Sequence, residues 1–270
     1  MSEKLFYPQE KLSNEAHIKS MDYYYKEYKR SIEDQNKFWE EKASRLNWYN
    51  KWDSVGSFDY SNGDIKWFEG GSLNASYNCL DRHIESGNGD RLALIWEGNN
   101  PAEDQHFSYK DLLKEVKKFS NVLLSLGVEK GDRVCLYMQM VPQLPIAMLA
   151  CARIGAVHSV VFGAFSSDSL RDRINDSSCK ILITQDTGVR GTKKNIPMKS
   201  NADKAVSQTP SIKHVVVVKR TGEPVAMDKN RDVWWEDKMS LASDECDPVK
   251  MNSEDPLFIL YTSGSTGKPK

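Results

Sequence analysis

Apolar and polar positions follow two different periods along this chain. From residue 91 onward, short apolar runs typical of β-strands are separated by longer segments whose apolar residues keep helical spacing. The predicted strands are 91–96, 133–138, 157–161, 180–184, 213–218 and 257–260. Strands that alternate with helices in this way indicate a layered α/β domain. We find no clean domain break between residues 91 and 261.

Local signals mark where the intervening helices begin and end. Ser108, with Asp111 three residues later, predicts a capped helix start, and Gly127 predicts its end. Gly155 predicts the end of a second helix. The predicted helices are 108–126, 145–154 and 167–176.

Residues 1 to about 50 are predicted to be helical and are rich in aromatic and charged side chains. Ser31 with Asp34 predicts another capped start. Three apolar residues would dock this helix on the main body: Phe38, Trp39 and Leu46. A tyrosine cluster precedes them: Tyr23, Tyr24, Tyr25 and Tyr28. Such a cluster either stacks on bases or packs an arm against the core, and the packing interpretation is favoured.

Between this region and the α/β pattern, Asn62-Gly63 predicts a two-residue hairpin turn. Asn74 then predicts the cap of a helix that runs to about residue 83. That helix ends in Asp81, Arg82 and His83, which suggest either acid–base chemistry or a structural ion pair. Because consecutive helix residues face different ways, the structural interpretation is favoured.

Composition narrows the possible partners. The chain has 270 residues with a net charge of −1, so it offers no bulk electrostatic attraction for nucleic acid or an anionic membrane. No stretch reaches the ~18 apolar residues that a membrane helix needs, and no secretory signal is visible. The five cysteines are scattered without a C-x-x-C pair, which argues against a disulfide framework or a zinc site. We therefore expect a reduced, cytoplasmic protein.

The last ten residues have the composition of a phosphate-binding loop. Gly264 and Gly267 allow positive φ, so that successive N–H groups can point into one concavity. Hydroxyl groups and a lysine complete the segment Thr262, Ser263, Gly264, Ser265, Thr266, Gly267 and Lys268. A Ser/Gly-rich surface turn that binds nothing is the alternative. The P-loop of common NTPases is excluded, because its spacing between glycines differs.

A basic cluster follows the predicted strand 180–184, at the carboxyl end where α/β sheets place ligand loops. Its cations are Arg190, Lys193 and Lys194. On the residues alone, a solvated charge run is the better interpretation.

Four strings resemble one family. The terminal string 261–270 resembles the nucleotide-phosphate signature of adenylate-forming enzymes. The string over 71–83, G-x-L-N-x-S-Y-N-C-L-D-R-H, and the stretch 147–163 resemble AMP-forming acetyl-CoA synthetases, as does 232–235. The chain is therefore identified as a member of that family, and as its amino-terminal part.

This resemblance implies the fold and the domains. It implies an α/β fold: a layered sheet-and-helix subdomain of the adenylate-forming fold with a mostly helical N-terminal extension. Residues 1–90 would form the extension, which packs on the core. Residues 91–270 would form an incomplete part of the large N-terminal domain, without the mobile C-terminal domain.

The implied reaction has two steps and small-molecule partners. Acetate and ATP give acetyl-adenylate and pyrophosphate, and CoA then displaces AMP to give acetyl-CoA. In the family, the 262–268 loop holds ATP phosphates and the basic residues hold the 3′-phosphate of CoA. The implied CoA-binding residues are Phe162, Gly163, Arg190, Gly191, Thr192, Lys193 and Lys194. Arg190 matches directly, whereas Lys193 or Lys194 replaces a second arginine.

Two departures from the family pattern lie beside the implied CoA site. Gln139 stands where the family usually has proline, and Ala164 stands where it usually has a second glycine. A Cβ at residue 164 restricts positive φ.

The resemblance places the catalytic residues and the Mg²⁺ ligand beyond this chain, so no metal site is expected here and the isolated chain is predicted to be inactive. Three alternatives remain open. The chain is a non-catalytic CoA- or nucleotide-binding fragment, a folding or interaction fragment without a ligand, or part of a propionyl- or other short-chain acyl-CoA synthetase.

Overall fold

The computed structural model describes residues 6–262, and the chain divides into two compact units between Gly71 and Ser72. The division falls before the Asn74 helix, so that segment belongs to the unit that contains the large sheet. Each unit is described by itself below.

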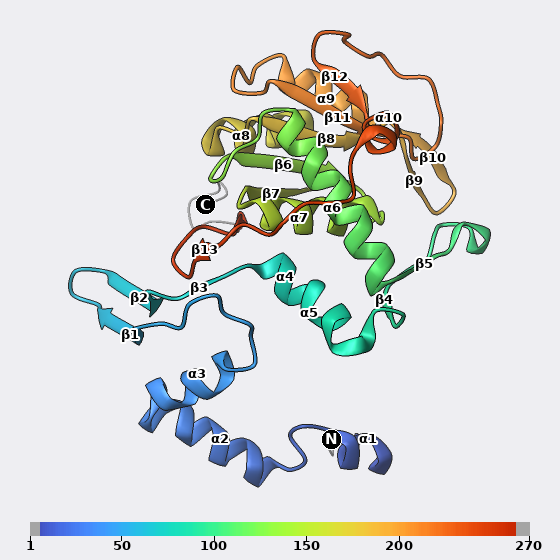
Figure 1. The fold of residues 1–270 in the computed structure, drawn as a ribbon. Coiled ribbons are helices and arrows are strands. Elements are labelled where there is room, and N and C mark those ends of the chain that lie inside the picture. Colours follow the sequence, from blue (N-terminus) through green and yellow to red (C-terminus); the bar gives the residue numbers. More distant parts are fainter. Residues whose placement is uncertain (1–5, 263–270) are drawn as a thin grey trace, which may run out of the picture. The chain divides into compact units, whose positions relative to one another are not determined.

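The first unit consists of helices followed by a β-hairpin (Figure 1). Its elements are α1 (Glu10–Glu15), α2 (Met21–Glu33), α3 (Gln35–Ala43), β1 (Ser54–Asp59) and β2 (Asp64–Glu69). Helix α2 is capped by Ser20, whose side chain accepts a hydrogen bond from the Tyr23 N–H. The predicted cap at Ser31 is wrong: Ser31 lies inside α2, and its hydroxyl donates to the Tyr28 carbonyl at 2.7 Å.

Aromatic rings of α3 and the hairpin pack against one another in this unit, whereas the tyrosines of α2 are exposed to solvent. The Trp39 and Trp67 rings meet edge to face at 5.8 Å, which joins α3 to the hairpin. The tyrosines of α2 are exposed, and the Tyr24 ring stacks on that of Tyr28 at 6.2 Å. The favoured interpretation, that the cluster packs this arm against the core, stays a prediction.

The predicted hairpin exists, but its loop has a different length. Asp59 pairs with Asp64, so that the loop spans the four residues 60–63 instead of two. The Asp59 carboxylate accepts hydrogen bonds from the N–H groups of Ser61 and Asn62, at 3.0 and 3.3 Å, and this stabilises the longer turn.

The second unit is built on a six-stranded parallel sheet, which fits the layered α/β domain that the sequence predicts (Figure 1). Strand β12 was not predicted. The strand order is β12-β11-β8-β6-β7-β14. The strands are β6 (Arg133–Met138), β7 (Val157–Phe162), β8 (Ile181–Gln185), β11 (His214–Val218), β12 (Asp232–Trp234) and β14 (Phe258–Ile259).

Helices cover the two faces of this sheet. Alternate residues of β6 enter separate cores: Leu136 packs in the core that includes α6 and α7, and Tyr137 packs in the core that includes α8 and α9. The helices are α6 (Tyr109–Ser125), α7 (Gln143–Ile154), α8 (Ser167–Ser177), α9 (Met198–Val206) and α10 (Trp235–Leu241). The Ser108–Asp111 capping box is present at the start of α6, as predicted.

Shorter elements complete the second unit. They are β3 (Ser72–Leu73), α4 (Ala75–Cys79), α5 (Asp81–His83), the π-helical turn Ile84–Asn88, β4 (Leu92–Trp96), the 3₁₀ turn Pro101–Glu103, β5 (Gln105–Ser108), β9 (Gly188–Arg190), β10 (Lys193–Ile196) and β13 (Met251–Asn252). Asn74 caps α4 as predicted, and Asp81 forms a structural ion pair with Arg153. The predicted strand 91–96 exists as β4, but within the described part of the chain it pairs with β5 alone and lies outside the large sheet.

The predicted strand at 257–260 is present as β14 but it is not buried. The side chain of Phe258 is 54% exposed and that of Leu260 is 67% exposed. Among the described residues, β14 pairs with β7 alone, at the edge of the sheet. An edge strand has a neighbour on one side only, which accounts for the exposure.

Candidate functional site

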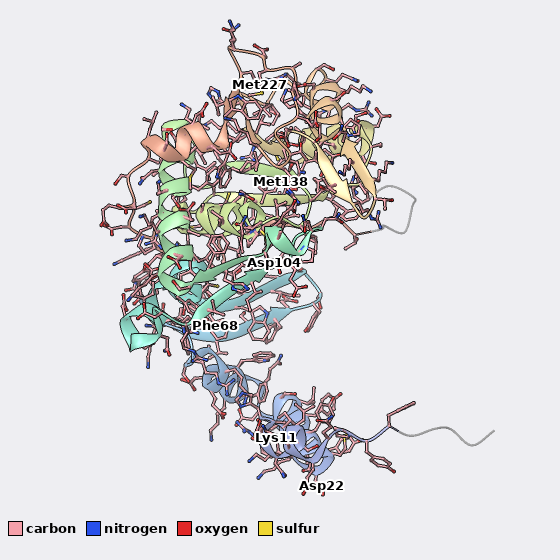
Figure 2. The ribbon with its side chains drawn as sticks, turned by 90° about the vertical axis from the view of Figure 1, so that its right-hand side faces the viewer. Lys11, Asp22, Phe68, Asp104, Met138 and Met227 are labelled. Carbon is pink, nitrogen blue, oxygen red and sulfur yellow. The ribbon has the colours of Figure 1, made fainter. Side chains whose placement is uncertain are left out.

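A cavity of about 670 Å³ opens in the second unit where β6 and β7 end. Its lining comes from segments 96–99, 138–141, 162–165 and 189–191 together with Lys193, Ile196, Asn201 and Arg220. Figure 2 faces this edge of the sheet, with Met138 of the β6 end near the centre of the view. In parallel sheets the carboxyl ends of the strands are where ligands bind.

The turn after β7 forms one wall of the cavity. Gly163 packs so closely that a Cβ there would lie 2.8 Å from the Met138 carbonyl oxygen, which explains the need for glycine. The Tyr137 hydroxyl donates to the Phe165 carbonyl at 2.8 Å and fixes the turn. Ala164 does not have positive φ, so its Cβ introduces no backbone strain.

The opposite wall is a small antiparallel hairpin of β9 and β10, which the sequence did not predict. Arg190 pairs with Lys193 across a turn in which Gly191 has a φ of +57°. Because residues paired across antiparallel strands share one face, these two cations lie together at the cavity. Neither forms an ion pair with a described residue, and their mutual repulsion favours an anionic ligand.

The remaining predicted CoA residues differ in their placement. Phe162, Gly163 and Gly191 line the cavity with Arg190 and Lys193. Thr192 and Lys194 are exposed and lie outside the lining. Of the two lysines that the sequence left as alternatives, Lys193 is therefore the one at the cavity.

A third cation, Arg220, also borders the cavity. The sequence analysis did not single out this residue. The Arg220 guanidinium donates to the Glu103 carboxylate at 2.6 Å and lies 5.2 Å from the Trp96 ring centroid. Its backbone is fixed by the buried Asp186, whose carboxylate accepts hydrogen bonds from the N–H groups of 187 and 220–222. The contacts from Asp186 to residues 220–222 join positions more than thirty apart, so no local pattern could reveal them.

Comparisons with known proteins decide the family. A model of the AMP-binding enzyme family matches residues 80–270, which is most of the chain, and a model of the acetyl-coenzyme A synthetase N-terminus matches residues 24–79. The chain belongs to the AMP-binding enzyme family.

Individual relatives of this AMP-binding enzyme chain are consistent with the family models. It is 52% identical over its whole length to an acetyl-coenzyme A synthetase of Halorhodospira halophila, of which it covers 42%. It is 53% identical over 92% of its length to the Magnetococcus marinus acetyl-coenzyme A synthetase, of which it covers 38%. The chain thus spans about two fifths of the length of the curated relatives it matches.

A solved structure shows the same fold. The acetoacetyl-CoA synthetase from Streptomyces lividans superposes with a TM-score of 0.80 at 24% identity, over 90% of this chain and 36% of that one. The predicted fold, a layered α/β sheet-and-helix part of the adenylate-forming fold with N-terminal helices, is confirmed.

The predicted ATP-phosphate loop, residues 262–268, begins at the last residue that the structure describes. Thr262 is exposed, and the predicted residues 263–268 lie outside the described part. The preceding Tyr261 donates its hydroxyl hydrogen to Asp176 at 2.6 Å. Burial, followed by this hydrogen bond, raises the pKa of Tyr261 to about 12.

Burial also shifts the pKa of a histidine in this chain. Burial lowers the pKa of His158 on β7 to about 4, and its Nδ1 has no hydrogen-bond partner among the residues that the structure describes. The cysteines are free thiols. Within residues 6–262 we find no group of three or more side chains suited to a metal ion, and no helix there is long and apolar enough to cross a membrane.

Proposed function

We propose that this chain supplies the CoA-binding cavity and the ATP-phosphate loop of an AMP-forming acetate–CoA ligase. The observation that carries the proposal is the meeting of the 162–163 turn with Arg190 and Lys193 around one cavity. These are residues for which the sequence resemblance implies CoA contacts. The names of the 52–53% identical relatives support acetate as the acid.

The cavity suits the phosphate-bearing end of CoA. Arg190 offers a planar fork for two oxygens of the 3′-phosphate, and Lys193 adds a second positive charge on the same face. Gly163 lets the turn pack against the Met138 carbonyl, and Phe162 offers an exposed ring to the ligand. Gly191, which lines the cavity, would contact the ligand from the hairpin tip. Glu97 is the lining carboxylate, so the anion is expected nearer Arg190 and Lys193.

In the first step, an acetate oxygen would attack the α-phosphorus of ATP, and pyrophosphate would leave. Residues 262–268 would hold the β- and γ-phosphates. In the second step, the CoA sulfur would attack the acetyl carbon, lose its proton and displace AMP. Both steps depend chiefly on positioning and on neutralising phosphate charge. ATP is expected as its Mg²⁺ complex, and we assign no Mg²⁺ ligand within the described residues.

The free thiols are compatible with a reducing compartment, and we propose the cytoplasm as the site of action. The proposed partners are acetate, ATP and CoA, with no nucleic acid or membrane.

A chimera tests the ligase directly. This chain would replace the matching amino-terminal 42% of the Halorhodospira halophila relative. We expect acetate-dependent exchange of labelled pyrophosphate into ATP. Faster exchange with propionate would select the short-chain alternative, and a folded chimera without exchange for any acid would refute the ligase. Arg190→Ala in the chimera should retain exchange while acetyl-CoA formation falls.

The isolated chain is proposed as a non-catalytic CoA-binding module. The cavity is lined by residues of the second unit alone, and the chain spans only about two fifths of its relatives. CoA binding without acetyl-CoA formation is therefore expected. Turnover by the isolated chain would contradict this, and the lack of any thermal shift with CoA or ATP would favour an interaction fragment.

A further inference from the structure

The tip of the β9–β10 hairpin is held by a side-chain amide from a distant segment. Asn99 Nδ2 donates to the Gly191 carbonyl at 2.9 Å, and the Gly191 N–H donates to Asn99 Oδ1 at 2.8 Å. The two bonds use both ends of one amide, and therefore fix the orientation of the Gly191 peptide as well as its position.

A second amide holds the hairpin on the other side of Arg190. The Val189 N–H donates to Gln139 Oε1 at 3.0 Å, and Gln185 Nε2 donates to the same oxygen at 3.2 Å. Gly188 makes room for this contact, since a Cβ there would lie 2.5 Å from Gln139 Oε1. Gln139 is itself held, because its N–H donates to Gln185 Oε1 at 2.9 Å.

Arg190 thus lies between two residues whose backbones are each tied to a neighbouring segment. The hairpin needs such ties, because a two-stranded ribbon is marginally stable by itself and this one pairs with no other strand in residues 6–262. The ties also oppose the repulsion between Arg190 and Lys193 across the turn.

We propose that Asn99 and Gln139 are positioning residues that fix Arg190 at the cavity for the phosphate of a CoA-type ligand. The inference rests on the proposed CoA site and adds to it. A hairpin that is already held in place loses less conformational freedom when the ligand binds. The two ties should therefore increase the affinity for CoA. Gln139 occupies a position where proline, which has no side-chain acceptor and no N–H, would provide none of these three hydrogen bonds.

The test is a calorimetric double-mutant cycle on the chain, with CoA as titrant. Asn99→Ala should weaken CoA binding roughly 3- to 10-fold, through loss of preorganisation. Gln139→Met should weaken it by a similar factor. In an Arg190→Ala background, neither substitution should weaken binding further. Hydrogen exchange at the Gly191 amide should be faster in Asn99→Ala, which reports the loss of the tie independently of CoA.

Asn121→Ala is the matched control. The Asn121 amide also donates two side-chain hydrogen bonds, to the carbonyls of Ser243 and Glu245 at 2.9 and 2.8 Å, but it is not part of the cavity lining. CoA affinity should be unchanged in this variant.

Two outcomes overturn the inference in different ways. If CoA binds the unsubstituted chain and Asn99→Ala leaves the affinity unchanged, or weakens it equally with and without Arg190, the positioning role is wrong and the CoA site stands. If the unsubstituted chain binds no CoA, the proposed CoA site itself fails and the positioning role fails with it.

Discussion

The Tyr261 hydroxyl donates a 2.6 Å hydrogen bond to Oδ2 of Asp176, and this contact joins the segment before the proposed ATP-phosphate loop to α8. The Arg173 guanidinium, one turn earlier on α8, lies 5.3 Å from the Tyr261 ring centroid and 4.6 Å from that of Phe165. Phe165 lines the cavity. One helix therefore connects the wall of the proposed CoA site to the start of the proposed ATP loop.

Tyr261→Phe should lower the free energy of unfolding by about 1 kcal/mol, the usual net value of one hydrogen bond. The raised pKa of Tyr261, about 12, gives a second measurement. Because the folded state holds the proton more tightly, this contribution is complete below pH 10 and is lost as the pH rises toward 12. Ultraviolet titration of the unsubstituted chain should show a phenol that ionises near pH 12 and is missing from the variant; identical curves would contradict the assignment.

His158 should make stability fall in mild acid. Burial lowers its pKa from 6.5 to about 4, so the unfolded chain binds the proton more tightly than the folded one. No penalty applies above pH 6.5, and roughly 3 kcal/mol of stability should be lost as the pH falls from 6.5 through 4. Urea unfolding at several pH values checks this. His158→Phe should flatten that part of the profile, and an unchanged slope would show that other groups cause it.

Asp81→Ala should strongly lower the free energy of unfolding. The Arg153 guanidinium is only 1% exposed and is held by both Asp81 oxygens at 2.9 Å. Removing the carboxylate leaves a buried charge with only the Cys246 carbonyl as a partner on Nε, which should cost about 3–5 kcal/mol. Chemical denaturation measures the loss. The double variant Asp81→Ala/Arg153→Met should recover part of it; a purely additive result would argue against a direct pairing energy.

Gly163→Ala and Ala164→Gly form a matched pair on the turn beside the cavity. The first places a Cβ 2.8 Å from the Met138 carbonyl oxygen and should cost about 1–3 kcal/mol of stability. It should also weaken CoA binding, because the turn must shift. The second should be nearly neutral for binding, since Ala164 does not need positive φ. Equal effects of the two substitutions would show that the close approach at Gly163 is not what matters.

Short-range signals predicted the elements that position the site, and long-range contacts could not be predicted. Ser108 with Asp111 and the stop at Gly155 act within a few residues, and both were confirmed. The same kind of signal misled at Ser31, because a serine inside a helix can bond to the preceding turn.

The candidate site divides in the same way. The strings around Phe162 and Arg190 were predicted from the resemblance, and the structure brings them to one cavity. The hydrogen bonds between Asn99 and Gly191 span 92 positions, and no local sequence signal near Asn99 predicts them. The β9–β10 hairpin was not predicted, because its charged residues are equally typical of a solvent-exposed loop.

The most direct test of the account compares CoA with dephospho-CoA, which lacks the 3′-phosphate, by calorimetry on this chain. If Arg190 and Lys193 bind that phosphate, CoA should bind about 10- to 100-fold more tightly than dephospho-CoA, the range expected for charge-assisted hydrogen bonds. Arg190→Ala should remove most of this difference. Equal affinities for the two ligands, or no binding of either, would contradict the assignment of this cavity to CoA.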